Sequence, residues 1–239
     1  MADLERLLEK TSRTFAIAIP WLDEPVRAEV TIAYLLFRIA DTFEDAERWP
    51  KATRERALEE FSELLGRPGA LTVDDHARVA RWVERRPCDD ASYLELLSET
   101  PSVLAALASL SPAARAIVTR HARRTCEGMA RVVERGGDDG HVELTTVDEL
   151  RDYCYIVAGI VGELLTELFL AEAPQLEGVR ATLEREAVAF GEGLQLVNIL
   201  KDQRDDARDG RAYLPRDVDR AAVFALARSD LERARAYVH

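Results

Sequence analysis

Apolar residues recur at intervals of three and four along nearly the whole chain, the spacing of one face of an α-helix. This pattern predicts helices over the ranges 3–10, 25–47, 51–65, 73–86, 90–98, 101–108, 112–135, 146–171, 176–207 and 218–238. Breaks rich in glycine, proline and aspartate separate them. Because no segment shows the alternation of a strand, the sequence predicts an all-α fold.

Two of these segments, 153–170 and 190–200, are predominantly apolar rather than amphipathic, so we expect them to be wholly buried. Each carries a pair of glycines: Gly159 and Gly162 in the first, Gly191 and Gly193 in the second. A glycine inside a helix costs about 1 kcal/mol relative to alanine. The pairs therefore predict either a close approach of neighbouring backbones or a kink beside a cavity.

Two clusters of carboxylates follow apolar runs, and both place their members at offsets of zero, three and four residues. The first comprises Asp41, Glu44 and Asp45, and the second comprises Asp202, Asp205 and Asp206. This spacing puts three like charges on one helix face. A solvated helix end explains one such cluster, whereas two with the same spacing favour paired sites for divalent metal. Mg²⁺ prefers oxygen ligands and often binds through carboxylates together with substrate phosphates.

Cations and apolar side chains surround both clusters. Arg38 precedes the first by three residues, Lys201 adjoins the second, and Arg211 follows it. Charge balance explains each cation alone, but the set suits a polyanion held between the clusters. The apolar helices would form a dry cavity that protects a carbocation, while metal and cations stabilise a leaving diphosphate. The residues therefore indicate ionisation of a prenyl diphosphate.

The composition narrows the class of protein. A formal net charge of −12 over 239 residues argues against a nucleic-acid binder, which usually shows a basic face. Three scattered cysteines fit a reduced, cytoplasmic protein. We expect no signal peptide and no membrane-spanning helix, although peripheral attachment at the inner face of a membrane stays open. With no linker or repeat, residues 1–239 are predicted to form one domain.

Four ordered blocks of the chain resemble the squalene/phytoene synthase family, the head-to-head prenyl transferases. The blocks are "SRTFAIAI", "YLLFRIADTFED", "YCYIVAGIVGELL" and "GEGLQLVNILKDQRDDARDGRAYLP", and they lie between residues 12 and 215. The resemblance implies an isoprenoid (prenyl) synthase fold, in which one helical domain encloses a central hydrophobic cavity. The two acidic clusters would hold Mg²⁺ at the mouth of that cavity.

The same resemblance implies roles for individual residues. Contacts with diphosphate fall on Ser12, Arg13, Arg38, Lys201 and Arg211. The substrate channel would be lined by Phe15, Val157, Leu194, Gln195 and Asn198. Tyr34 and Tyr153 match catalytic positions, and Tyr153 is the better candidate for proton transfer beside the departing diphosphate. Taken without the resemblance, Tyr153 reads as a core aromatic with a satisfied hydroxyl.

The acidic motif "DTFED" resembles the corresponding motif of squalene synthases more than that of phytoene synthases. It favours condensation of two farnesyl diphosphates to presqualene diphosphate and then squalene, a second step that uses NADPH. Phytoene or dehydrosqualene synthesis without a reductant is the alternative. Family members continue beyond the equivalent of His239, so we expect this chain to lack the family's C-terminal helices. The sequence contains no glycine-rich nucleotide-binding motif, so the use of NADPH cannot be argued from the residues themselves.

Two other classes of protein share some of these features. A helical nucleotide pyrophosphohydrolase also uses paired acidic motifs, but it needs a polar base pocket, and the helices here are apolar. A non-catalytic relative that serves in assembly is expected to have lost acidic ligands, and both clusters are intact. Prenyl diphosphates are therefore the expected partners, and the oligomeric state stays open.

Overall fold

The computed structural model describes residues 3–12, 14–46, 48–67, 69–136, 144–208, 213–214 and 218–238, without the side chains of 204–208. All regular structure in these ranges is helical, which confirms the predicted fold class. Contacts divide the chain into two compact units, Met1–Ala130 (unit 1) and Arg131–His239 (unit 2). The single domain expected from the sequence stays a prediction.

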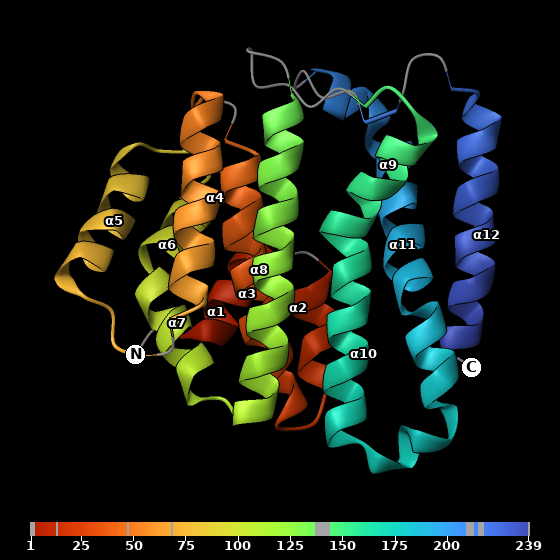
Figure 1. Cartoon of the computed structure of the whole chain (residues 1–239), viewed down its shortest axis with the longest axis horizontal. Coiled ribbons are helices and arrows are strands. Elements are labelled where there is room, and N and C mark those ends of the chain that lie inside the picture. The colour runs from red at the N-terminus through yellow and green to blue at the C-terminus, as the bar shows by residue number, and fades with distance from the viewer. Residues whose placement is uncertain are drawn as a thin grey trace. The chain divides into compact units, whose positions relative to one another are not determined.

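Unit 1 is built around one central helix, α3 (Val26–Glu44), which packs against α1, α4, α6 and α7 (Figure 1). Its other elements are α1 (Leu4–Thr11), α2 (Phe15–Ala18), the 3₁₀ turn η1 (Ile19–Trp21), α4 (Lys51–Leu65), α5 (Val73–Glu84), α6 (Ala91–Ser98), α7 (Thr100–Ser109) and α8 (Pro112–Arg135), the last up to Ala130. Periodicity missed α2 and η1 because neither spans two full turns.

An aromatic cluster fixes the C-terminal end of α3. Phe43 lies 4.8 Å from the ring of Trp82 and 6.0 Å from those of Trp49 and Phe61, measured between ring centroids. Both indoles are anchored, because Trp82 Nε1 donates to Glu60 and Trp49 Nε1 donates to a backbone carbonyl. The end of α3 that carries the first acidic cluster is therefore held by the core of unit 1.

Unit 2 is built around α11 (Arg180–Arg208), which packs against its neighbours on either side (Figure 1). The other elements are α9 (Val147–Cys154), the π-helix η2 (Tyr155–Gly159), α10 (Ile160–Glu172), the 3₁₀ turn η3 (Pro174–Val179) and α12 (Arg220–Val238). The helix expected over 146–171 is thus interrupted by a π turn. Such wide turns inside helices are rare and occur frequently at functional sites.

The glycine pairs mark a close approach of two helices. A Cβ added at Gly162 would lie 2.0 Å from the carbonyl oxygen of Ala187, and one added at Gly191 would lie 2.0 Å from that of Ala158. Helix α11 therefore contacts η2 and α10 backbone to backbone. Of the two explanations offered for these glycines, the close approach is confirmed.

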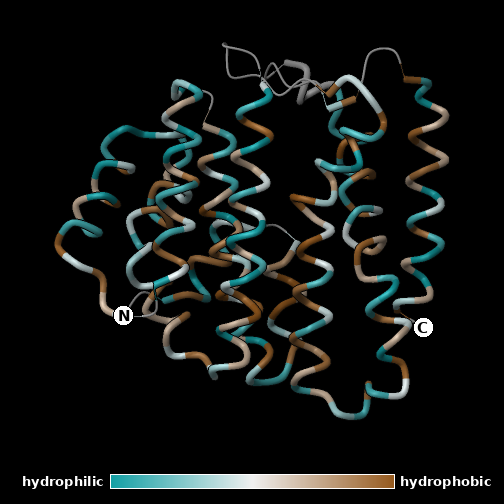
Figure 2. Tube along the Cα trace, in the orientation of Figure 1, coloured by the Kyte–Doolittle hydropathy of each residue, from teal (hydrophilic) through white to brown (hydrophobic). Residues whose placement is uncertain are grey.

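The expectation that 190–200 is wholly buried is wrong. Leu196 and Ile199 are buried, but 48% of Leu194 and 40% of Val197 are exposed. Apolar residues recur along α10 and α11 in Figure 2, yet only part of α11 faces the core of the unit. By length and hydropathy alone, the stretch Val147–Glu172 passes as a membrane span. Half of its apolar 18-residue window is buried, and buried core helices pass the same test.

We predict that Gly162→Ala and Gly191→Ala each lower the free energy of unfolding by about 2 kcal/mol, because overpacking against a backbone oxygen outweighs the gain in helix propensity. Denaturant unfolding followed by circular dichroism measures the change. Gly178→Ala is the matched control, since a Cβ there meets nothing within 4 Å. Parent-like stability of both helix variants would contradict the close contact.

Candidate functional site

The connection between α1 and α2 is fastened to α3. The Tyr34 hydroxyl donates to the carbonyl oxygen of Thr11 over 2.7 Å, and its ring lies 5.4 Å from that of Phe15. Ser12 Oγ accepts hydrogen bonds from the backbone N–H groups of Phe15 and Ala16. Three residues predicted for the site, Ser12, Phe15 and Tyr34, therefore lie together.

Arg38 lies between two tyrosine rings beside the first acidic cluster. Its guanidinium carbon is 5.8 Å from the ring centroid of Tyr34 and 5.5 Å from that of Tyr93, and Nη1 lies 3.3 Å from Asp41 Oδ2. Burial acts to lower the pKa of Arg38, but Asp41 and the two tyrosines outweigh it and raise that pKa. Tyr93 comes from α6, and no local motif marked it in the sequence.

The three carboxylates of the first cluster are not equally accessible. Asp41 and Asp45 are partly exposed, whereas only 4% of Glu44 is accessible to solvent. The buried Arg54 donates to the carbonyl oxygen of Glu44. Burial raises the pKa of Asp41 to about 6, with Arg38 opposing the shift and Asp45 adding to it.

The donor set of this cluster fits a hard cation that is shared with a ligand. Asp41 and Asp45 offer carboxylate oxygens, the atoms that Mg²⁺ prefers. In the described part of the chain, no three carboxylate, imidazole or thiol side chains come together closely enough to hold a metal ion. The binding of Mg²⁺ by this cluster therefore stays a prediction. The assignment of Glu44 as a third ligand stays a prediction.

The predicted site residues of unit 2 lie on α9, η2 and α11. Tyr153 is buried, and its ring stacks on that of Tyr213 with centroids 4.8 Å apart. Lys201 Nζ lies 3.3 Å from Asp202 Oδ2, and both side chains are accessible. Arg13 and Arg211, together with the side chains of Asp205 and Asp206, lie outside the described residues.

The predicted channel residues of unit 2 are accessible rather than buried. Leu194 and Asn198 are exposed, and Val157 and Gln195 are half-buried. The expected burial of 190–200 therefore fails at Asn198 as well. Unit 1 and unit 2 each carry one acidic cluster, and the convergence of the two clusters on one cavity stays a prediction.

Helices α11 and α12 bury a second group of acids that the sequence did not single out. Glu192 is 6% exposed and Asp230 is 2% exposed. Arg151 Nη2 lies 3.7 Å from Glu192 Oε2, and Arg233 Nη1 lies 4.0 Å from Asp230 Oδ1. Burial raises the pKa of Glu192 to about 7. The signal available in the sequence was a glutamate placed between Gly191 and Gly193.

The sequence model of squalene/phytoene synthase matches residues 8–239. This chain belongs to that family. It is 30% identical over 211 residues to a squalene synthase of Ganoderma lucidum, covering 88% of this chain and 42% of the relative. It is 29% identical over 216 residues to a squalene synthase of Schizosaccharomyces pombe, covering 89% and 44%. The chain therefore spans less than half the length of these relatives.

Solved structures of the family confirm the fold. The complex of TcSQS with the ligand BPH1237 matches with a TM-score of 0.71 and 28% identity, covering 98% of this chain and 66% of that one. The complex of TcSQS with E5700 matches with a TM-score of 0.76 and 26% identity, covering 96% and 67%. The predicted isoprenoid synthase fold of squalene synthases is thus confirmed.

Because the pKa of Glu192 is raised in the folded protein, we expect the free energy of unfolding to depend on pH. A carboxylate with a folded pKa of about 7 and a usual value of 4.5 binds its proton more tightly in the folded state. Stability therefore falls as the pH rises from about 4.5 to 7. We predict that Glu192→Gln stabilises the protein by about 2 kcal/mol at pH 8 and much less at pH 5.

Thermal unfolding of parent and variant at both pH values measures this difference. Besides Glu192, the charged groups that act on this site are Arg151, Asp152, Asp230 and Arg233, and all are retained in the variant. Glu232→Gln, at an exposed position on α12, is the matched control. An equal effect of Glu192→Gln at pH 5 and pH 8 would show that this carboxylate does not titrate between them.

Proposed function

We propose that this protein catalyses the Mg²⁺-dependent head-to-head condensation of two prenyl diphosphates with release of diphosphate. The substrate we propose is farnesyl diphosphate, giving presqualene diphosphate and then squalene with hydride from NADPH. The setting of Arg38 carries this proposal: its guanidinium lies over the rings of Tyr34 and Tyr93 and beside Asp41.

Arg38 suits a diphosphate because its charge is fixed in place before a ligand arrives. The guanidinium contacts the rings of both Tyr34 and Tyr93, and Nε has no hydrogen-bond partner among the described residues. A buried donor of this kind favours an anion that can accept from it. Bound Mg²⁺ would supply further positive charge for the leaving diphosphate, through oxygens of Asp41 and Asp45.

A stripe on α11 supports the assignment of a hydrocarbon channel. Leu194, Val197 and Asn198 share one accessible face, and Lys201 follows at the next helical step. The stripe ends at Asp202, the first residue of the second acidic cluster. An apolar wall that leads to a charged end matches a prenyl chain with a diphosphate head.

Tyr153 is the proposed group for proton transfer near the departing diphosphate. Its ring stacks on the ring of Tyr213, with an angle of 21° between the two ring planes, and this contact fixes its orientation. Such stacking orients the phenol ring. Tyr34 is the weaker candidate for chemistry, because its hydroxyl already donates to Thr11.

Two observations support farnesyl diphosphate rather than geranylgeranyl diphosphate as the proposed substrate. The first is the motif at residues 41–45, and the second is that the relatives are named squalene synthases. Phytoene or dehydrosqualene formation without reductant is the alternative product outcome. We place the enzyme in the cytoplasm, with peripheral contact at the inner face of a membrane. Incubation with either substrate, with and without NADPH, identifies the product.

We predict that Asp41→Ala and Asp202→Ala each lower diphosphate release at least 100-fold, as expected when a group that stabilises leaving-group charge is removed. Purified protein, Mg²⁺ and farnesyl diphosphate are used, and diphosphate is measured. Asp74→Ala, at an exposed position of α5, is the control for the loss of one carboxylate. Normal turnover by either site variant would overturn the role of that cluster, provided its circular dichroism matches the parent.

We predict that Tyr93→Leu raises KM for the prenyl diphosphate about tenfold, because one face of the Arg38 guanidinium loses its aromatic partner. Tyr93→Phe keeps the ring and should stay within about twofold of the parent. Steady-state kinetics of both variants measure the difference. Equal losses in leucine and phenylalanine variants would assign the effect to the hydroxyl rather than to the ring face.

A further inference from the structure

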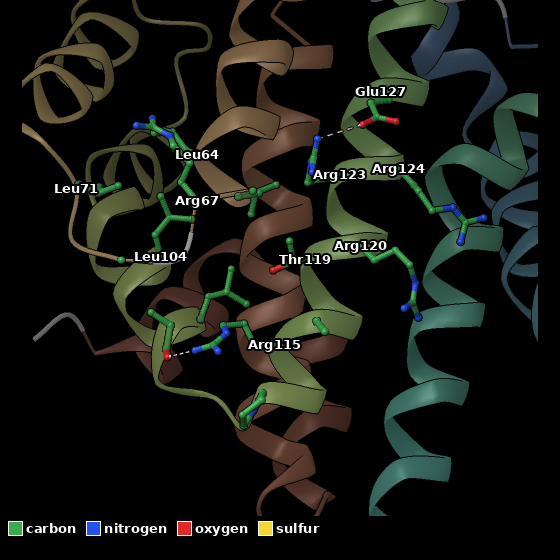
Figure 3. Close-up of a pocket in the computed structure, with 17 residues that line it drawn as sticks. Leu64, Arg67, Leu71, Leu104, Arg115, Thr119, Arg120, Arg123, Arg124 and Glu127 are labelled. Atoms are coloured by element: carbon green, nitrogen blue, oxygen red, sulfur yellow. Dashed lines mark hydrogen bonds and ion pairs between the residues drawn. The ribbon is translucent and has the colours of Figure 1, made fainter.

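Unit 1 contains a groove that takes no part in the site described above. It has a volume of about 550 Å³ and lies between the C-terminal end of α4, helix α7 and the N-terminal half of α8 (Figure 3). Leucines form its floor: Leu64, Leu65, Leu71, Leu104 and Leu107. None of the predicted catalytic, metal or channel residues lines it. The volume falls in the range of about 300–1,000 Å³ that is usual for small-molecule sites.

Arginines mark both ends of this groove. Arg115, Thr119 and Arg123 are spaced four residues apart and share one face of α8. Figure 3 shows Arg115 at one end and Arg123 towards the other, while Arg120 and Arg124 point away from the leucine floor. In a chain with a net charge of −12, this placement of positive charge beside an apolar floor runs against the overall charge.

The groove arginines differ in how far their charge is compensated. Arg67 Nη2 lies 2.7 Å from Asp75 Oδ1, and Arg123 Nη2 lies 3.9 Å from Glu127 Oε1. Arg115 Nη1 donates to the backbone carbonyl of Ala108 over 2.9 Å. Within the described part of the chain, Arg115 has no carboxylate within 4.0 Å. Arg115 is half-buried, so its uncompensated charge lies against the apolar floor.

We propose that this groove binds a hydrocarbon chain that carries a phosphate head group. The hydrocarbon chain lies over the leucines of α4 and α7 and against the half-buried Leu71, and binding is favoured because the chain's own apolar surface leaves water. The phosphate pairs with Arg115, whose remaining N–H groups are suited to two phosphate oxygens at once. A soluble alkyl or prenyl phosphate and the head group of an anionic membrane lipid share this chemistry.

The first experiment uses dodecyl phosphate below its micellar concentration and isothermal titration calorimetry. Inorganic phosphate supplies the head without the chain, and dodecyl maltoside supplies the chain without the charge. We expect both to bind at least tenfold more weakly than dodecyl phosphate. Equal binding of inorganic phosphate, or of the maltoside, would overturn the proposal of an amphiphile with a phosphate head.

Variants locate the binding on the protein. Arg115→Gln and Leu71→Glu should each weaken dodecyl phosphate binding at least tenfold, and Leu71 is half-buried at the edge of the groove, so its change spares the core. Arg81→Gln, at an exposed position of α5, is the matched control and should bind like the parent. Arg38→Gln should also keep the groove binding, which separates this proposal from the proposed function. Parent-like binding by both groove variants would overturn it.

The second experiment distinguishes the two sources of the ligand. The protein is sedimented with phosphatidylcholine vesicles, with and without phosphatidic acid. Sedimentation that needs both phosphatidic acid and Arg115 assigns the groove to a membrane lipid. Binding of soluble dodecyl phosphate through Arg115, without such sedimentation, assigns it to a free amphiphile. The proposal is contradicted if Arg115→Gln changes neither the sedimentation with vesicles nor the calorimetric binding of dodecyl phosphate.

Discussion

The proposed chemistry depends first on how α3 ends. Phe43 is buried among aromatic rings, while Asp41, two residues earlier, remains partly exposed. A helix that ends in solvent leaves its last carbonyl groups without partners in the helix. Here the buried Arg54 donates to the carbonyl of Glu44. The carboxylates are therefore carried by a rigid end of the helix, and little reorganisation is needed when a ligand binds.

The second constraint is the cost of removing charge from water. A buried charge without an opposite charge nearby destabilises the folded state. Removing one member of a buried ion pair therefore leaves the other member in this unfavourable state. Arg38 meets this requirement with one carboxylate and two aromatic faces. Because aromatic faces hold the cation without neutralising it, the guanidinium keeps positive charge available for an anionic ligand.

Much of the fold followed from helical periodicity, because each long helix buries one continuous face. The short elements α2 and η1 carry too few residues to show a period, and the π turn at Tyr155–Gly159 leaves the apolar pattern unchanged. The acidic clusters were recognisable because one spacing occurs twice. The role of Tyr93 could not be recognised from the sequence, because its contact with Arg38 joins residues far apart along the chain. Periodicity also overestimated the burial of 190–200, because the hydrophobicity of a side chain does not determine which face of the helix meets a neighbour.

The accessible stripe on α11 follows from the partners that occupy the rest of this helix. Gly191 and Ala187 contact η2 and α10 backbone to backbone, and Gly193 lies against Asp230 of α12. With those faces taken, Leu194 and Val197 keep 48% and 40% of their surface accessible. The stripe runs at about 1.5 Å per residue towards Lys201 and Asp202. The glycines that permit the close packing thus also determine which face of α11 stays accessible within unit 2.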